Sequence, residues 1–214
     1  AIAEASYQNA VAYARERLQG RSPSGPRDAA KPADPIIVHP DVRRMLLTQK
    51  AFAEGSRALI YFLAQQGDIL DRGDEEAAKK ADDLMSMLTP IGKAFVTETG
   101  FEAANHGVQI YGGHGFIREW GMEQIVRDAR IAMLYEGTTG IQALDLLGRK
   151  VAMREGAALS ALLSEIDFTL SAAAVLPALT AHCTQLAAVV SQLKTTTARL
   201  GLLRDGGEAP RALA

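Results

Sequence analysis

The chain has 214 residues, of which 48% are hydrophobic and 22% are charged, and its formal net charge is −2. This composition is typical of a globular protein, with one large domain or one domain and an extension, and it excludes a disordered or fibrous chain. The near balance of 23 basic and 25 acidic side chains gives no electrostatic footprint for nucleic acid or for an anionic membrane. The one cysteine, Cys183, excludes an internal disulfide framework and fits a reducing compartment.

The sequence shows neither the pattern of a membrane-spanning helix nor that of a signal peptide. The most apolar segment, residues 168–181, is roughly 14 residues long, whereas a helix needs about 20 apolar residues to cross a bilayer. The first residues, AIAEASYQ, lack the basic start and the apolar run of a signal peptide. We therefore expect no membrane span and a cytoplasmic location. Because the chain does not begin with Met, we also expect it to be a fragment.

Frequent Ala, Leu, Glu, Lys, Arg and Gln, and the lack of an alternating β-branched segment, predict helices throughout. A first helix is expected over residues 2–18 and ends at Gly20. The proline-rich segment RSPSGPRDAAKPADP follows, which predicts a long surface loop over about residues 21–40. A second, amphipathic helix begins at Pro40 or Asp41, and Gly67 is expected to end it.

A third helical pattern begins at Asp74 and reaches Ile110, and Pro90 is expected to kink or break it. A helix over residues 122–131 follows. Thr138 or Thr139 can cap the next helix, whose expected apolar stripe is Ile141, Leu144, Leu147 and Val151. After Gly156 a last Ala- and Leu-rich pair of helices is split by Pro177. Together these elements predict an all-α antiparallel helical bundle, with one domain over residues 1–155 and a helical extension over residues 156–214.

A cluster of glycines follows the third helical pattern, in the segment Gln109-Ile-Tyr-Gly-Gly-His-Gly-Phe116. Paired glycines at a helix end are typical of a C-cap followed by a turn. Because glycine has no Cβ, they also allow a phosphate or a flat ring to approach backbone N–H groups closely. The segment is not a Rossmann fingerprint, since no strand precedes it, and not a P-loop, since no Gly-Lys-Ser/Thr follows. Both interpretations stay open from these residues alone.

Two charged residues are candidates for a site. Glu136 lies between two predicted helices, where it is either a solvated loop acid near a helix N-terminus or a general base held over a cavity. Arg17 ends the first predicted helix, where a basic side chain is stabilising, and it is also suited to bind a phosphate. His106 and His114 lack the ligand spacing of a metal site, so we expect no bound metal.

Taken together, these segments resemble the C-terminal helical region of the acyl-CoA dehydrogenases. Residues 13–20 (YARERLQG) resemble the family's Y-A-x-E-R-x-x-F-G helix end without its Phe, and residues 108–116 (VQIYGGHGF) resemble its Q-x-x-G-G-x-G-[FY] turn. The segments RDARI at 127–131, YEGT at 135–138 and IQ at 141–142 resemble its R-D-A-[KR]-I…Y-E-G-T-x-x-I-Q pattern. The resemblance covers about residues 1–155. The loop and the extension resemble the larger members, including those that act on methylthiopropionyl-CoA.

The resemblance implies an FAD-dependent enzyme that removes hydrogen from the α and β carbons of an acyl-CoA thioester. Glu136 stands at the position of its general base. Four residues match positions that contact FAD, and in family dimers this is the FAD of the neighbouring subunit: Arg17, Gln109, Gly112 and Gly113. Thr138 matches another FAD-contacting residue. Gly140 stands where the family often has Gln. Phe116 and Trp120 are expected to pack the turn.

The resemblance also implies a homodimer or homotetramer, and electron-transferring flavoprotein as the electron acceptor. Family members carry further domains ahead of this region, so we expect the chain alone to hold the base without a complete active site and to be inactive. An alternative is a non-catalytic helical module for oligomerisation or interaction, which would use the residues after Gly156.

Overall fold

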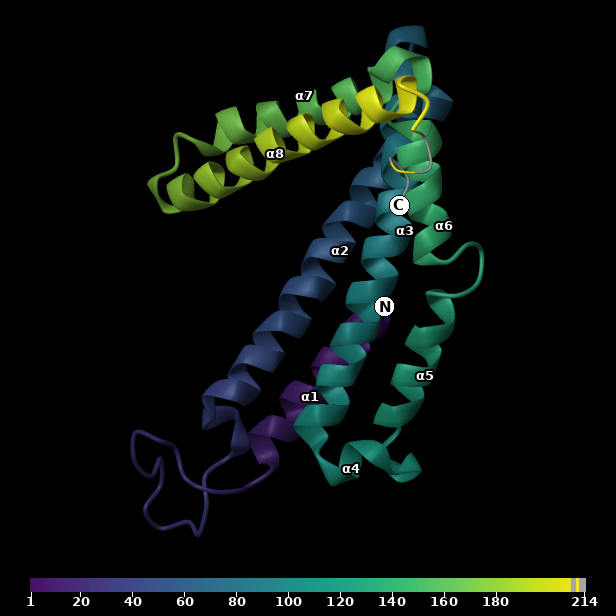
Figure 1. The fold of residues 1–214 in the computed structure, drawn as a ribbon. Helices are drawn as coiled ribbons and strands as arrows, with labels where there is room; N and C mark the ends of the chain where they lie inside the picture. Colours follow the sequence, from purple (N-terminus) through teal and green to yellow (C-terminus); the bar gives the residue numbers. More distant parts are fainter. Residues whose placement is uncertain (209–210, 212–214) are drawn as a thin grey trace. The chain divides into compact units, whose positions relative to one another are not determined.

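The computed structural model describes residues 1–208 and 211 and confirms the all-α prediction (Figure 1). Among these residues no β-strand forms, and one isolated antiparallel bridge joins Leu18 to Pro35. The chain divides into two compact units, Ala1–Tyr61 with Gly92–Thr139 and Phe62–Ile91 with Gly140–Ala214. The predicted boundary between residues 155 and 156 stays a prediction.

The helices of the first unit are α1 (Ile2–Glu16), η1 (Ile36–Val38), α4 (Gly113–Phe116), η2 (Arg118–Trp120) and α5 (Met122–Ala132). The long helices α2 (Pro40–Arg72) and α3 (Glu75–Tyr111) contribute residues to both units. The second unit adds α6 (Thr139–Asp145), η3 (Leu146–Lys150), η4 (Met153–Gly156), α7 (Ala157–Ala173), η5 (Pro177–Leu179) and α8 (Thr180–Asp205).

The core of the first unit depends on small residues that let the helices approach one another. Helix α1 buries Ala3, Ser6, Ala10 and Ala14, a spacing that places them along one face. Ser6 Oγ lies 2.9 Å from Gln49 Oε1 and 3.1 Å from the Ala103 carbonyl oxygen, which ties α1 to α2 and α3. A Cβ on Gly107 would lie 2.2 Å from Ser6 Oγ and 2.5 Å from Met122 Cε. The contact of α1, α3 and α5 therefore requires a glycine at position 107.

The proline-rich loop is organised around one carboxylate. Asp34 is fully buried, and its Oδ2 and Oδ1 accept the backbone N–H groups of Ser22 and Arg27, each at 2.9 Å. These backbone hydrogen bonds, Ser22 first, hold the pKa of the Asp34 carboxyl below its usual range, and Arg21 at 3.6 Å adds to the effect. Backbone bonds between Asp34 and the stretch Gln19–Gly20 close the loop at its base.

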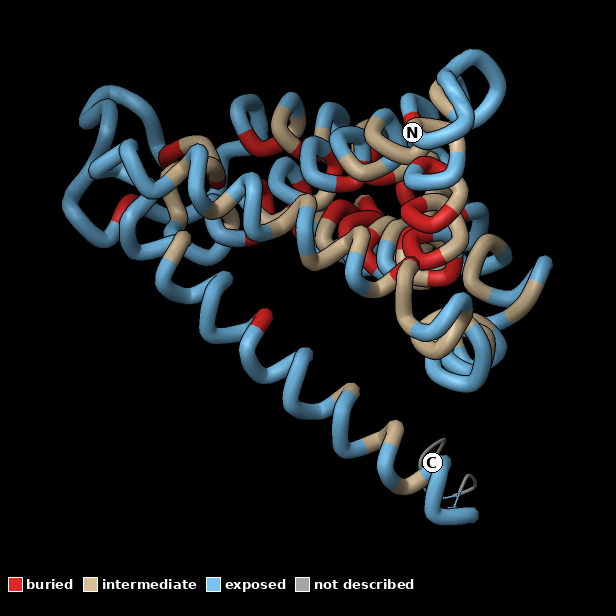
Figure 2. Tube along the Cα trace, turned by 90° about the horizontal axis from the view of Figure 1, so that it is seen from above, coloured by how far each residue is buried: buried red, intermediate tan, exposed pale blue. Residues whose placement is uncertain are grey.

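In the second unit, the buried apolar side chains of α3 include Ala81, Leu84, Met87 and Leu88. Helices α7 and α8 form an antiparallel hairpin joined around Pro177, as the sequence predicts (Figure 1). Figure 2 shows that most of α8 is exposed, and Val190 is its one buried residue among those described. The hairpin therefore contributes little buried apolar surface of its own.

Three local predictions are wrong. Helix α2 continues past Gly67 and ends at Arg72, because an isolated glycine lowers helix propensity without ending a helix that packs on one face. The break predicted at Pro90 does not occur, because helix α3 continues through it, and the predicted kink stays a prediction. The Pro90 ring is fully buried, so packing offsets the lost hydrogen bond. In α6 no residue is buried, and the expected stripe residues Ile141 and Leu144 are exposed.

Candidate functional site

The glycine turn ends α3 and begins α4. Gly112 has φ 59° and ψ −136°, a conformation that favours glycine, and a Cβ on Gly115 would lie 2.5 Å from the Val108 carbonyl oxygen. The fold alone explains these two glycines. Gly113 differs, because its φ is unexceptional and a Cβ there would meet nothing within 4 Å. The fold thus does not require a glycine at position 113, where the backbone is exposed.

A pocket of about 580 Å³ opens beside this turn, a volume within the usual range for small-molecule sites. Four of the five residues predicted to contact a cofactor line it: Arg17, Gln109, Gly112 and Gly113. They come from the end of α1 and the end of α3. Thr138, the fifth, does not line this pocket.

The electrostatic character of the pocket is basic. Its lining includes Arg17, His39 and His114, and none of the lining residues, all of which the structure describes, is Asp or Glu. The base of the proline-rich loop supplies Gln19, Gly20 and Ile36 to the same lining. A guanidinium, two imidazoles and an exposed glycine backbone suit a phosphate or diphosphate group.

An aromatic cluster holds one wall of the pocket. The rings of Tyr13 and Tyr111 stack with centroids 4.0 Å apart, and those of His114 and Trp120 stack at 4.7 Å. The Tyr13 hydroxyl lies 2.8 Å from His114 Nδ1, and burial raises the pKa of Tyr111. Trp120 therefore packs the turn as predicted. Phe116 does not, because it is 80% exposed, and its predicted packing is wrong.

Glu136 lies in the turn between α5 and α6, and its side chain is exposed. Its φ is 54°, a left-handed conformation that costs a non-glycine residue about 1–2 kcal/mol. Helix α3 anchors the turn just beyond it: Lys93 Nζ donates to the Gly137 carbonyl, and Thr139 Oγ1 donates to Glu98 Oε1 at 2.6 Å. The position of Glu136 is thus fixed by its neighbours and is unfavourable for its own backbone.

The two candidate sites lie at opposite ends of α5. This helix has 11 residues, which at 1.5 Å per residue span about 16 Å. The pocket at the glycine turn is next to its N-terminus, and Glu136 follows its C-terminus. A small ligand cannot contact the glycine-turn pocket and Glu136 at once, whereas an extended ligand, or two separate ligands, can.

Sequence reasoning missed Tyr13, His39 and His114 as pocket residues. Tyr13 and His114 lie inside segments already identified as motifs, which is the signal that could have found them. His39 follows the apolar stretch Ile36–Val38, and nothing in that pattern indicates a pocket. Among the described residues, no group of three or more His, Cys, Asp or Glu side chains could hold a metal ion.

Comparison with known proteins shows the class of protein. The family described as "Acyl-CoA dehydrogenase, C-terminal domain" matches residues 1–152, and the chain belongs to this family. Over 156 residues it is 53% identical to the 3-methylmercaptopropionyl-CoA dehydrogenase of Ruegeria pomeroyi, covering 73% of this chain and 26% of that protein. It is 40% identical to the broad-specificity linear acyl-CoA dehydrogenase FadE5 of Mycobacterium tuberculosis, in a match that covers 75% of this chain and 27% of that protein. The chain thus spans about a quarter of the length of these relatives.

Solved structures agree in fold. Caenorhabditis elegans ACDH-11 superposes with a TM-score of 0.77 at 19% identity and covers 96% of this chain and 33% of that one, a likeness of fold alone. Butyryl-CoA dehydrogenase of Megasphaera elsdenii gives a TM-score of 0.52 at 26% identity and covers 69% of this chain and 32% of that one. Within the described residues, no helix combines the length and apolarity needed to cross a membrane.

Proposed function

We propose that the chain supplies the general base and part of the FAD site of an acyl-CoA dehydrogenase, which oxidises an acyl-CoA thioester between its α and β carbons. The observation that carries this proposal is the turn at Glu136, whose backbone is kept in a left-handed conformation while α3 anchors the two residues Gly137 and Thr139 that follow it. Backbone strain of this kind is retained where the surrounding structure fixes it, and it is concentrated at functional sites.

In this mechanism Glu136 accepts the proton from the α carbon of the thioester on a carboxylate oxygen. The backbone N–H of Glu136 donates to the thioester carbonyl oxygen and stabilises the negative charge that develops there. FAD bound to this enzyme would supply the acceptor for the β hydrogen, which would leave as a hydride. The anchors from Lys93 and Glu98 hold the base in place, which lowers the entropic part of the barrier.

The residues around the glycine turn fit the phosphate part of FAD. Arg17 is the strongest donor in the pocket, and Gly113 leaves backbone exposed where the fold does not require a glycine. Since α5, which is about 16 Å long, lies between the glycine turn and Glu136 in the chain, the pocket suits a part of FAD remote from the reacting ring. It equally suits the FAD of a neighbouring subunit in a homodimer or homotetramer. Thr138 is proposed as a further FAD contact beside the base.

The test of the base uses Glu136→Gln in a full-length protein that contains this chain. We expect turnover to fall by about 10²–10⁴-fold while the flavin absorbance of the purified protein is unchanged. Glu54→Gln, an exposed carboxylate on α2, is the matched control and should retain turnover. Near-normal turnover of Glu136→Gln would remove this residue from the mechanism.

The test of the pocket compares Arg17→Met with Arg15→Met, a neighbouring arginine on α1 that does not line the pocket. Loss of a charged hydrogen-bond donor should weaken FAD binding by about tenfold or more in the Arg17 variant only. Equal affinity of the two variants would show that the pocket is not a flavin subsite. We expect the 214-residue chain alone to bind FAD weakly, and flavin titration measures this.

Electron-transferring flavoprotein is proposed as the electron acceptor. The alternative, a non-catalytic interaction module, is favoured by apolar side chains on the hairpin, since Phe168 and Val175 are 72% and 77% exposed. Mass measurement by size-exclusion chromatography with light scattering tests assembly. An oligomer that persists in Glu136→Gln and Arg17→Met, together with normal turnover in both, would favour the module.

A further inference from the structure

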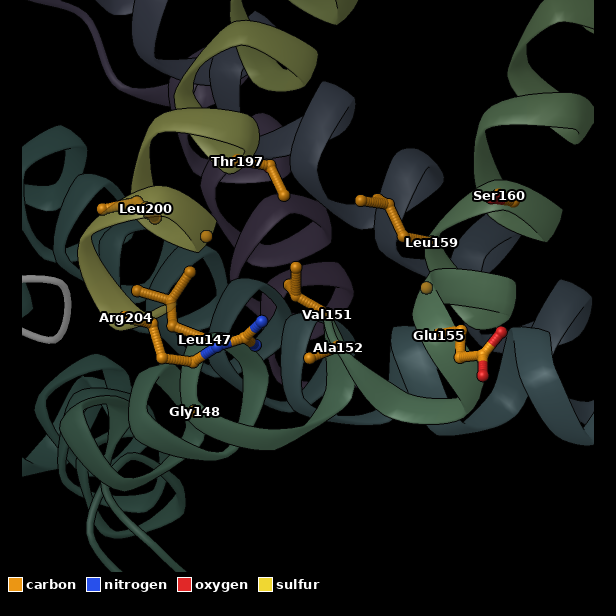
Figure 3. Close-up of a pocket in the computed structure, with 12 residues that line it drawn as sticks. Leu147, Gly148, Val151, Ala152, Glu155, Leu159, Ser160, Thr197, Leu200 and Arg204 are labelled. Carbon is orange, nitrogen blue, oxygen red and sulfur yellow. The ribbon is translucent and has the colours of Figure 1, made fainter. Parts of the chain in front are cut away.

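The second unit holds a pocket that is separate from the sites proposed above. The segment η3–η4, the start of α7 and the end of α8 enclose it, with a volume of about 520 Å³ (Figure 3). Aliphatic side chains from all three elements form its walls, namely Leu147, Val151, Leu159 and Leu200. Its volume lies within the range of about 300–1,000 Å³ that is usual for small-molecule sites.

The charge of the lining is asymmetric. Arg204 and Glu155 are its charged residues. Figure 3 shows the Arg204 side chain extending from α8 toward Val151 and Ala152, whereas the Glu155 carboxylate points away from these side chains. Arg204 pairs with Asp205 through Nε at 3.1 Å, so its two Nη groups lie on the other side of the guanidinium. The pocket therefore presents a cation next to an aliphatic wall.

Two features keep this space open. A Cβ on Gly201 would meet nothing within 4 Å, so the absent side chain leaves room in α8. The opposite wall contains a turn in which Arg154 and Glu155 have φ values of 51° and 56°. Arg154 holds this turn by pairing with Asp82 and with Asp83, the latter at 2.6 Å. Such a conformation persists only where its surroundings fix it, so the wall is not free to collapse inward.

We propose that this pocket binds one monomeric fatty carboxylate, with its aliphatic chain along the leucine and valine walls and its carboxylate on Arg204. An apolar wall binds an aliphatic chain by removing both surfaces from water, and the guanidinium forks match the two oxygens of a carboxylate. This site is independent of the acyl-CoA site proposed at Glu136, because it takes a free acid and uses none of the same residues.

The experiment titrates the 214-residue chain with dodecanoate by isothermal calorimetry, below the micelle concentration, with 1-dodecanol as the neutral probe of equal chain length. We expect one saturable site for dodecanoate and about fivefold weaker binding of dodecanol, because a partly exposed ion pair contributes modestly. Arg204→Met should bring the dodecanoate affinity down to that of dodecanol and leave dodecanol unchanged.

Filling variants test the location of the site. Gly201→Leu places a side chain in the open space of the pocket and should abolish binding, whereas Gly55→Leu, at an exposed glycine of α2 with equally open space, should bind as the parent does. If Gly201→Leu fails the circular-dichroism check of folding, Ser160→Leu fills the pocket from α7. Unchanged binding in a folded filling variant, equal affinity for acid and alcohol, or no saturable binding would each overturn the proposal.

Discussion

Gly107 offers a sharp test of how the first unit is packed. In the interior of α3, replacing glycine by alanine stabilises a helix by about 1 kcal/mol when space allows. At position 107 the new Cβ would lie 2.2 Å from Ser6 Oγ and 2.5 Å from Met122 Cε, well inside contact distance. The methionine terminus can rotate, whereas the Ser6 hydroxyl is held by Gln49 and by the Ala103 carbonyl.

The free energy of unfolding for Gly107→Ala follows from these opposing effects. Overpacking a well-filled core costs about 1–3 kcal/mol, and contacts this short favour the upper end. Set against a propensity gain of about 1 kcal/mol, the net loss is about 2 kcal/mol. Gly100→Ala, in the same helix with nothing within 4 Å of its Cβ, should instead gain about 0.5–1 kcal/mol.

Urea unfolding, followed by the fluorescence of Trp120, measures both variants in the unit that holds the contact. Adding Ser6→Ala to Gly107→Ala should recover part of the loss, because it removes the atom that the new methyl group meets. Ser6→Ala alone should destabilise, since it leaves buried partners of Ser6 without their bond. A Gly107→Ala chain as stable as Gly100→Ala would refute this account of the packing.

Three further outcomes follow from buried or strained residues. Because the folded pKa of Asp34 is lowered, its stabilising effect is present above the ordinary aspartate pKa of 3.8 and is lost as pH falls through the folded value. The protection of loop amides from hydrogen exchange, relative to the intrinsic rate at each pH, should therefore fall on acidification, and Asp34→Asn should show the lowered protection at pH 7. Leu84→Ala should lower the free energy of unfolding by about 2–5 kcal/mol, while Leu47→Ala, at a 67% exposed position, should change it by less than about 0.5 kcal/mol in urea titrations. Arg154→Met should speed hydrogen exchange around the turn before α7, because it removes the ion pairs with Asp82 and Asp83. Arg149→Met, which loses only a pair with Asp145, should leave that exchange rate unchanged. Equal exchange rates in the two variants would mean that the ion pairs of Arg154 do not hold the turn.

The sequence predicts most of the helical framework, because helix ends here carry local signals. Asp74 caps α3 by accepting the Ala77 N–H at 2.9 Å, and Gly112 takes the positive φ that ends the same helix. The failures at Gly67 and Pro90 have one cause, which is that burial on a long helix face overrides the propensity of a single residue.

The pocket at the glycine turn was only partly predictable. Arg17 and Gln109 line the same pocket although 92 positions separate them in the chain. Helical periodicity gives no indication that they lie in one site, whereas the family resemblance does. Asp34 was not predictable, because an aspartate among prolines and small polar residues is typical of any solvated loop. Its burial arises from backbone N–H groups that the folded loop turns inward, and a residue-by-residue pattern does not carry that information.

The closure of the proline-rich loop at its base has an evolutionary consequence. Backbone bonds between residues 17–20 and 34–36 join the two ends, and the pocket takes its lining from those ends. The entropic penalty of a longer closed segment grows only with the logarithm of its length. Related proteins are therefore free to lengthen, shorten or rewrite residues 28–32 at the tip, and the shape of the neighbouring cavity should be inherited unchanged.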